Sequence, residues 1–178
     1  MIYGNVEMDK YVLSIPDFPE EGIIFRDVTS VLKDPDGLNL AISEFTKICE
    51  NTEFDAVVGL ESRGFIFGTP VAYNLHKAFI PVRKAGKLPR EVVRAKYALE
   101  YGEAEIEIHK EDIKPGMKVI IIDDLLATGG TLEAAAKLVE SLGGEVVKMA
   151  VMIELQGLKG RERLAEYKLE SIVAYDGK

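Results

Sequence analysis

The sequence of 178 residues contains no tryptophan, only one cysteine and no long uninterrupted apolar run. The lone cysteine, Cys49, excludes an intrachain disulfide and fits a reducing compartment. No apolar stretch approaches the ~20 residues that are needed to cross a bilayer. The first residues, MIYGNVEMDK, lack the basic region and apolar core of a signal peptide. We therefore expect a cytoplasmic protein that does not contact a membrane.

The sequence also has fewer basic residues than acidic ones. The 22 lysine and arginine residues and the 30 acidic residues give a net charge of −8, which argues against a nucleic-acid surface. A content of 47% hydrophobic and 29% charged residues is typical of a folded protein and excludes a disordered chain. No linker or repeat divides the chain, so residues 1–178 are expected to form one domain. A basic cluster at Arg83–Lys87 could still bind a small anion.

The hydrophobic pattern predicts strands that alternate with helices. Apolar residues between Leu38 and Cys49 recur at helical spacing, and further helices are expected after Gly64 and from Leu132 to Leu142. Short apolar runs predict strands at 54–60, 78–83, 119–123 and 145–155. Such alternation is typical of a mostly parallel α/β sheet, in which ligands bind beyond the carboxyl ends of the strands.

Three other segments do not fit the alternation of buried strands and helices. Ser14–Pro35 is rich in proline and predicts extended segments and turns. Lys84–Glu100 is polar and has no clear period, and loops of this length are usually functional lids or disordered. Ala104–Ile108 alternates strictly, which predicts a strand with one face in water.

The run Val119–Thr131, VIIIDDLLATGGT, carries the clearest functional signal. Small residues and glycines let backbone N–H groups close around a phosphate, and the N-terminus of the following helix adds partial positive charge. The carboxylates of Asp123 and Asp124 would repel a phosphate, so we expect them to face a ribose diol or a bound Mg²⁺. A purely structural strand-to-helix turn is the alternative. The expected phosphate- and ribose-binding residues are Asp123, Asp124, Ala127, Thr128, Gly129, Gly130 and Thr131.

This run resembles the phosphoribosyl pyrophosphate (PRPP) motif of the type I phosphoribosyltransferases. No Walker A sequence, G-x-x-x-x-G-K-[ST], is present. Further segments resemble the adenine-specific members of that family: PDFPEEGIIFRDVTSVLKDP, GLESRGFIFG, VRKAGKLP, YALEYGEAEIEIHK and ELQGLKGRERL. The resemblance runs from Pro16 to about Leu164, in the order in which the family has these segments.

The resemblance implies the fold and the reaction. The expected fold is the type I phosphoribosyltransferase fold: a mostly parallel central sheet flanked by helices, with an N-terminal hood at about residues 1–35 and a mobile catalytic loop. The expected reaction joins adenine to PRPP and gives AMP and pyrophosphate. The resemblance also implies a homodimer and a Mg²⁺ cofactor that is bound mainly through PRPP, with no protein metal ligand.

The resemblance also assigns roles to individual residues. The residues that are expected to bind pyrophosphate are Glu61, Ser62, Arg63, Arg83, Lys84 and Lys87. The resemblance also implies a cis peptide bond between Glu61 and Ser62. Adenine binding falls to Ile24, Phe25 and Arg26, with the ring of Phe25 suited to stack on a purine. Glu100 becomes the catalytic residue that exchanges a proton with the base. Tyr97 and Tyr101 belong to the lid, which would exclude water from a cation-like sugar.

Two other functions stay open at this point. One is a transferase for a 6-oxopurine, hypoxanthine or guanine, which would need a hydrogen-bond donor where adenine needs an acceptor. The other is a non-catalytic regulator that binds PRPP. Such regulators usually carry a DNA-binding segment or a basic face, which this sequence lacks. His76 and His109 show no metal-ligand spacing and are expected to be structural.

Overall fold

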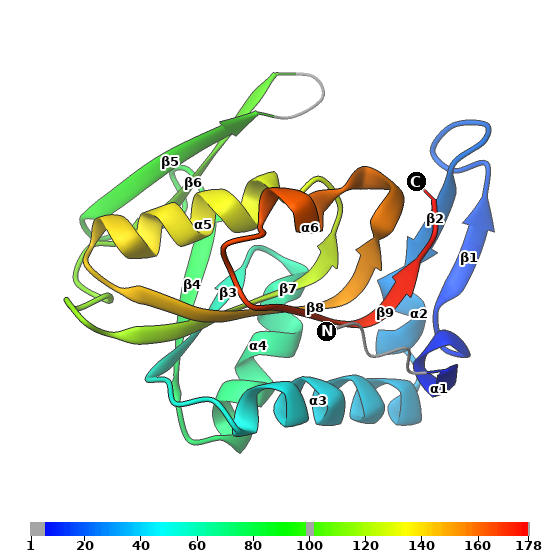
Figure 1. Cartoon of the computed structure of the whole chain (residues 1–178), viewed down its shortest axis with the longest axis horizontal. Coiled ribbons are helices and arrows are strands. Elements are labelled where there is room, and N and C mark those ends of the chain that lie inside the picture. Colours follow the sequence, from blue (N-terminus) through cyan, green and yellow to red (C-terminus); the bar gives the residue numbers. More distant parts are fainter. Residues whose placement is uncertain (1–5, 99–101, 178) are drawn as a thin grey trace.

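The computed structural model describes residues 6–98 and 102–177. Within these ranges it contains a seven-stranded sheet with helices on both faces, which confirms the predicted α/β class (Figure 1). The strand order is β5-β6-β4-β3-β7-β8-β9. Strands β4, β3, β7, β8 and β9 run parallel, and β6 and β5 add an antiparallel hairpin at one edge. The strands are β3 (Ala56–Leu60), β4 (Ala78–Lys84), β5 (Val92–Ala98), β6 (Glu103–His109), β7 (Lys118–Leu126), β8 (Glu145–Leu155) and β9 (Leu169–Tyr175).

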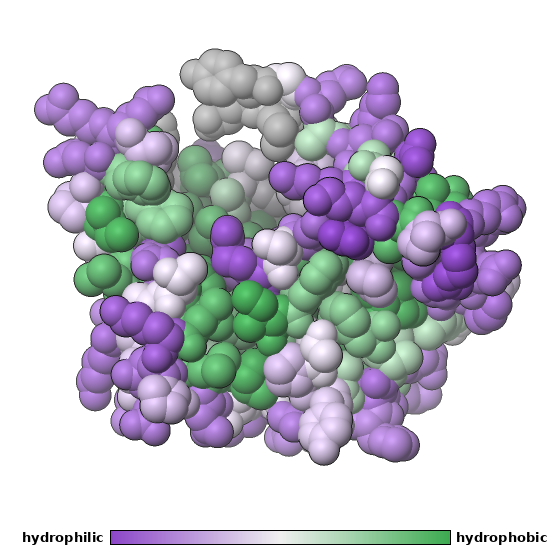
Figure 2. Space-filling model, turned by 180° about the vertical axis from the view of Figure 1, so that it is seen from behind, coloured by the Kyte–Doolittle hydropathy of each residue, from purple (hydrophilic) through white to green (hydrophobic). Residues whose placement is uncertain are grey.

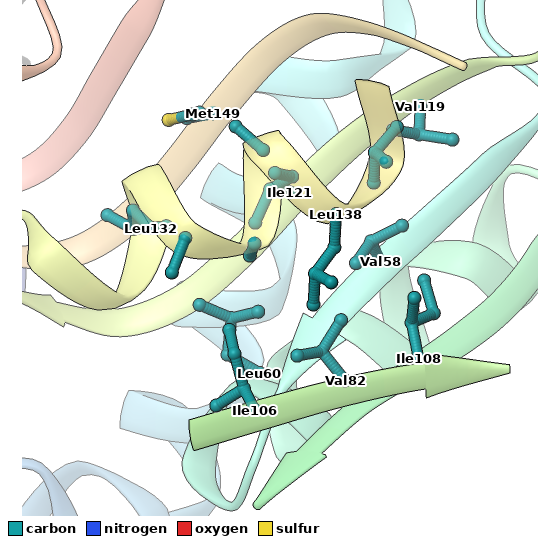
Figure 3. Packing of buried hydrophobic residues seen from close by; sticks show 14 of the residues in the cluster. Val58, Leu60, Val82, Ile106, Ile108, Val119, Ile121, Leu132, Leu138 and Met149 are labelled. Atoms are coloured by element: carbon teal, nitrogen blue, oxygen red, sulfur yellow. The ribbon is translucent and has the colours of Figure 1, made fainter. Parts of the chain in front are cut away.

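The buried strands alternate their side chains between two apolar layers, one on each face of the sheet. Val57, Ile120 and Ile122 pack toward α3 (Pro35–Glu50) and α4 (Arg63–Asn74). Val58 and Ile121 point the other way, toward α5 (Gly130–Ser141) (Figure 3). Because both faces are covered, the central strands are apolar at almost every position, as parallel strands usually are.

The N-terminal part of the chain forms a separate small layer beside β9 (Figure 1). It contains α1 (Val6–Asp9), the hairpin of β1 (Leu13–Pro16) and β2 (Ile24–Asp27), and α2 (Val28–Leu32). The hydroxyl of Tyr175 donates to Asp9 at 2.6 Å, and the guanidinium of Arg26 lies 3.9 Å above the Tyr175 ring. The C-terminal strand therefore holds this layer against the main sheet.

The prediction that Ser14–Pro35 contains only extended segments and turns was wrong, because this range includes helix α2. The carboxylate of Asp27 accepts a hydrogen bond from the backbone N–H of Thr29 at 2.8 Å, which caps the helix. Val28 and Val31 are buried by tertiary packing. A five-residue helix shows too little of the helical period to be seen in the sequence, and this packing decides its conformation.

The prediction of one long loop over Lys84–Glu100 was wrong, because β5 occupies part of it. Val93, Ala95 and Tyr97 pack against the α5 layer, whereas Arg94 and Lys96 lie on the other face of the strand and are exposed. This period of two is visible in the sequence VVRAKYA, but the small Ala95 and the charged neighbours weaken it.

The prediction of a wet face for the strand at Ala104–Ile108 was wrong at Glu107. This carboxylate is fully buried, because Arg94 and a backbone turn surround it with hydrogen-bond donors. The expected strand end at Asp123 was also misplaced, since β7 continues to Leu126.

The remaining helices are short: the 3₁₀ turn η1 (Gln156–Leu158) and α6 (Gly160–Arg163). Among the described residues, no helix is both long and apolar enough to cross a membrane.

Candidate functional site

The carboxyl ends of three neighbouring strands, β4, β3 and β7, meet at one edge of the sheet and surround a cavity of about 460 Å³. Strand β3 stops pairing with β7 at Ile122, while β7 continues for four residues beside β8. This unequal length opens the space in which the side chains of the cavity lie. The cavity is lined by Glu61, Ser62, Arg63, Lys84, Lys87, Tyr97, Asp123, Asp124, Leu125, Ala127 and Thr131.

The segment Ala127–Thr131, which the motif predicts to bind a phosphate and which is called the phosphate loop below, follows β7 and leads into α5. Gly129 has a φ of +80°, a conformation that side chains rarely adopt, and α5 starts at the next residue. Thr128, Gly129 and Gly130 line a smaller hollow that shares Asp123, Leu125, Ala127 and Thr131 with the cavity. The N-terminus of a helix of 12 residues therefore opens on this hollow, where it favours an anion.

The two acidic residues of the motif both line the cavity, but their surroundings differ. Burial and the adjacent charge of Asp124 raise the pKa of Asp123 well above its usual range. Asp124 forms an ion pair with Arg63, which reaches it from the start of α4. Burial lowers the pKa of Arg63, but this ion pair more than offsets the effect and raises it. Gly64 allows this approach, because a Cβ there would lie 2.7 Å from the carbonyl oxygen of Ile122.

The turn between β3 and α4 contains the expected cis peptide between Glu61 and Ser62. The carboxylate of Glu61 accepts hydrogen bonds from Arg83 at 2.9 Å and from the backbone N–H of Lys84 at 2.8 Å. The ammonium of Lys87 lies 3.7 Å from the same carboxylate. The hydrogen bond from Arg83 is the main reason that the pKa of Glu61 is lowered. Glu61 therefore holds the basic residues of β4 together at the wall of the cavity.

A third hollow extends the site toward the N-terminal layer. It is lined by Phe25, Arg26, Asp27, Val28, Thr29, Arg63, Asp124 and Leu125. Phe25 is 37% exposed and its ring centroid lies 5.2 Å from that of Phe18, in an edge-to-face arrangement. Ile24 is exposed and does not line this hollow. Since Arg63 and Asp124 border both spaces, the hollow adjoins the main cavity.

The structure brings most of the predicted site residues together. Tyr97 lines the cavity from β5, whereas Arg83 lies behind Glu61 and does not line it. Glu100 and Tyr101 fall outside the described residues.

Sequence reasoning missed several residues that complete these walls. Leu125 and Thr29 line the hollows. Gly160 supports the phosphate loop from behind, and Glu107 supports the basic turn after β4. No local sequence signal marks either of these two supports.

The described residues contain no group of three or more His, Cys, Asp or Glu that could hold a metal ion by themselves. Asp123 and Asp124 are two adjacent carboxylates, and one of them is already paired with Arg63. Such a pair suits hydroxyl donors, or a Mg²⁺ ion whose other ligands are substrate phosphates and water.

Comparison with known proteins agrees with this geometry. Residues 27–177 match the family model described as the phosphoribosyl transferase domain. A curated relative from Lachnoclostridium phytofermentans, named adenine phosphoribosyltransferase, is 63% identical over 172 residues, which cover 97% of this chain and 99% of the relative. The crystal structure of adenine phosphoribosyltransferase from Thermoanaerobacter pseudethanolicus superposes with a TM-score of 0.90 at 48% identity, covering 95% of this chain and 98% of that one.

A third relative was crystallised with ligands. The enzyme from Saccharomyces cerevisiae, complexed with an imino-altritol bisphosphate and adenine, has a TM-score of 0.88 at 40% identity, with 94% of this chain and 97% of that one covered. The matches extend over nearly the whole chain and include every segment that lines the cavity. The chain therefore belongs to the phosphoribosyltransferase family, among the adenine phosphoribosyltransferases.

Proposed function

We propose that this protein transfers the phosphoribosyl group of PRPP to adenine. A bond forms between a ring nitrogen of the base and the anomeric carbon of the ribose, the bond from that carbon to the pyrophosphate oxygen breaks, and the products are AMP and pyrophosphate. One observation supports this proposal most strongly. A helix N-terminus, an acidic pair and a basic wall border the same cavity, so that a phosphate, a ribose and a pyrophosphate would each meet a complementary group.

The loop from Ala127 to Thr131 is proposed to bind the 5′-phosphate. Backbone N–H groups at the start of α5 point their partial positive charge toward the smaller hollow. Thr131 lines both spaces, and its hydroxyl could donate to a phosphate oxygen. Asp123 and Asp124, next to this loop, are proposed to accept hydrogen bonds from the ribose hydroxyls.

The opposite wall is proposed to bind the pyrophosphate. Ser62, Arg63, Lys84 and Lys87 line it, and Arg83 supports it through Glu61. The guanidinium of Arg63 is suited to pyrophosphate oxygens, because its fork of donors matches two oxygens at once. Its ion pair with Asp124 would then have to give way to the substrate, which would also free Asp124 for the ribose. Within this wall Glu61 is proposed to position cations, since its own charge would repel pyrophosphate.

The hollow lined by Phe25 and Arg26 is proposed to receive adenine. The exposed ring of Phe25 can stack on the purine, and the backbone of this segment can supply both a donor and an acceptor. The yeast relative, which was crystallised with adenine, supports the choice of this base. Residues 1–35 would thus act as the hood over the base.

Mg²⁺ is proposed as the cofactor, held mainly by PRPP oxygens. When bound, it would offset the negative charge of the leaving pyrophosphate. We also propose a cytoplasmic location, which the buried thiol of Cys49 would suit.

A homodimer is proposed as well. Helix α4 exposes Ile66 and Tyr73, which lie two helical turns apart on one side, and Tyr73 is 85% exposed. The reverse face of the molecule carries a group of apolar residues (Figure 2). Large exposed apolar patches commonly mark protein–protein interfaces.

Separate incubations with PRPP and adenine, hypoxanthine or guanine test the proposal. Nucleotide and pyrophosphate formed in each mixture would be measured, and adenine should be the preferred base. Preferential turnover of hypoxanthine or guanine would refute the choice of adenine. PRPP binding without turnover of any base would favour a regulator instead.

The Glu100→Ala variant tests the catalytic residue. We expect PRPP to bind nearly as well as in the wild type, because Glu100 is proposed to act on the base. Turnover should fall by about 10²–10⁴-fold, the usual contribution of a positioned proton-transfer group. Titration calorimetry with PRPP and initial rates would separate the two effects. An unchanged rate would remove Glu100 from the mechanism.

A further inference from the structure

The buried carboxylate of Glu107 lies directly behind the basic turn that follows β4. Its side chain is fully buried on β6, where an unpaired charge would be very costly. One oxygen accepts hydrogen bonds from the backbone N–H groups of Lys87 and Leu88, both at 2.8 Å. The other oxygen accepts from the guanidinium of Arg94 on β5 at 3.0 Å. One buried anion therefore joins a turn to a strand.

Each of the two segments that Glu107 joins has a residue that lines the cavity. Lys87, whose backbone is held, lines the cavity with its side chain. Tyr97 lines the same cavity three residues after Arg94 along β5. Gly86, just before the held residues, has a φ of +84°, so the chain turns sharply at this point. The turn has two longer attachments: a hydrogen bond of 3.4 Å from Arg83 to the carbonyl of Lys87, and the ammonium of Lys87, which lies 3.7 Å from the carboxylate of Glu61.

The hydrogen bonds to Glu107 are charge-assisted and therefore stronger than neutral ones. Burial raises the pKa of Glu107, but the hydrogen bonds from the backbone of Gly86 and Leu88, from Arg94 and from Lys87 outweigh this and lower it to about 2. The carboxylate is thus ionised at neutral pH, and both of its oxygens accept hydrogen bonds.

We propose that Glu107 is a positioning residue for PRPP binding, which fixes the Lys87 turn and strand β5 around the pyrophosphate side of the cavity. It does not touch the substrate, since it is buried behind the turn. This inference rests on the proposed function, because it names the support of the proposed pyrophosphate wall. Without Glu107, the turn would lose its main attachment and Lys87 would no longer be held toward the leaving group.

The Glu107→Gln variant tests this proposal, because it keeps the shape of the side chain and removes its charge. The amide oxygen of glutamine can still accept the hydrogen bonds on one side. Its NH₂ group would then face either Arg94 or the backbone N–H groups, which are also donors. We expect the KM for PRPP to rise by about tenfold to hundredfold, the value of one charge-assisted hydrogen bond. The KM for adenine should change by less than about threefold, because the base hollow lies on the far side of Arg63.

The matched control is Glu103→Gln on the same strand. Glu103 also faces a cation of β5, Lys96, at 3.7 Å, but both side chains are exposed. Such pairs contribute little, so this variant should keep wild-type kinetics.

A double-mutant cycle with Lys87→Ala separates positioning from general stability. If Glu107 acts through Lys87, then Glu107→Gln should change the PRPP affinity by less than about threefold once Lys87 is alanine. An equal loss in both backgrounds would overturn the proposal, and so would a PRPP KM within about threefold of wild type in Glu107→Gln.

The Glu107→Asp variant serves if Glu107→Gln fails to fold. It keeps the charge but cannot reach both partners, so the KM for PRPP should still rise, whereas Glu103→Asp should not change it. An unchanged KM in Glu107→Asp would refute the positioning role. A wild type that neither binds PRPP nor forms nucleotide would refute the proposed function itself, whereas an active wild type with unaffected Glu107 variants would refute only this inference.

Discussion

Substituting Gly160 by alanine should displace the phosphate loop (Ala127–Thr131), although Gly160 itself does not line the cavity. Gly160 begins α6 and lies directly behind the loop. A Cβ built there would overlap the carbonyl oxygen of Ala127 and lie 2.7 Å from Cδ1 of Leu126. The backbone of Gly160 is not in the left-handed region, so alanine could adopt its conformation. The whole effect would therefore come from the contact with the loop.

The expected loss of AMP affinity in Gly160→Ala follows from these contacts. Restoring ordinary van der Waals separation requires a displacement on the order of 1 Å. A misplacement of this size in a binding loop can cost about 10²-fold in activity. We expect the affinity for AMP to fall by about tenfold to hundredfold, since the helix N-terminus and the loop would no longer fit one phosphate together. Overpacking should also cost about 1–3 kcal/mol of stability.

Gly157→Ala is the matched control. A Cβ at Gly157 would lie 2.6 Å from the carbonyl oxygen of Gly177, so it would clash with backbone in the same region but away from the loop. Calorimetric titration with AMP and thermal unfolding should be measured for both variants. Both should lose some stability, but only Gly160→Ala should lose AMP affinity. Equal AMP affinity in the two variants would refute the reasoning.

Three further predictions concern stability and reactivity. Asp27→Ala should lower the free energy of unfolding by about 1 kcal/mol, because α2 loses its cap, and urea titration would measure this. Acid should weaken the fold through Glu107, because the pKa of this carboxylate is lower in the folded protein than in the unfolded chain. Its contribution to stability is complete above its ordinary pKa of 4.5 and is lost as the pH falls toward about 2. Urea midpoints should therefore decrease over this range but not between pH 6 and 8. Cys49 should not react with a thiol reagent at pH 8 until the protein is unfolded, since burial raises its pKa to about 12, and rapid reaction of the native protein would contradict this.

The sequence predicted those parts of the fold in which a long periodic pattern decides the structure. Helix α3 and strand β8 were predicted at nearly their observed positions, because each repeats one hydrophobic pattern over many residues. Strand β9 was missed because Glu170 and Ser171 interrupt its apolar residues, and α2 was read as turn because it has only five residues and is stabilised by tertiary packing. Strand β5 was read as loop because its inward residues include the small Ala95.

The candidate site was predictable where the residues lie next to one another in the chain. The phosphate loop and the turn at Glu61–Gly64 carry local signals of glycine and charge. The ion pair between Arg63 and Asp124 joins residues that lie 61 positions apart, and no local pattern reports such a pairing. For the same reason Glu61 was predicted from the resemblance to bind pyrophosphate, whereas in the structure its carboxylate accepts a hydrogen bond from Arg83. Its role, like those of the other site residues, stays a prediction.

The strand order also has a consequence for the newly made chain. Strand β3 lies between β4, which follows it closely, and β7, which is synthesised much later. Until Lys118–Leu126 has left the ribosome, one edge of the apolar strand AVVGL has no partner. An unpaired apolar edge of this kind is where nascent chains aggregate or recruit chaperones. The insertion of β7 would therefore close the exposed edge and complete the cavity in the same folding step.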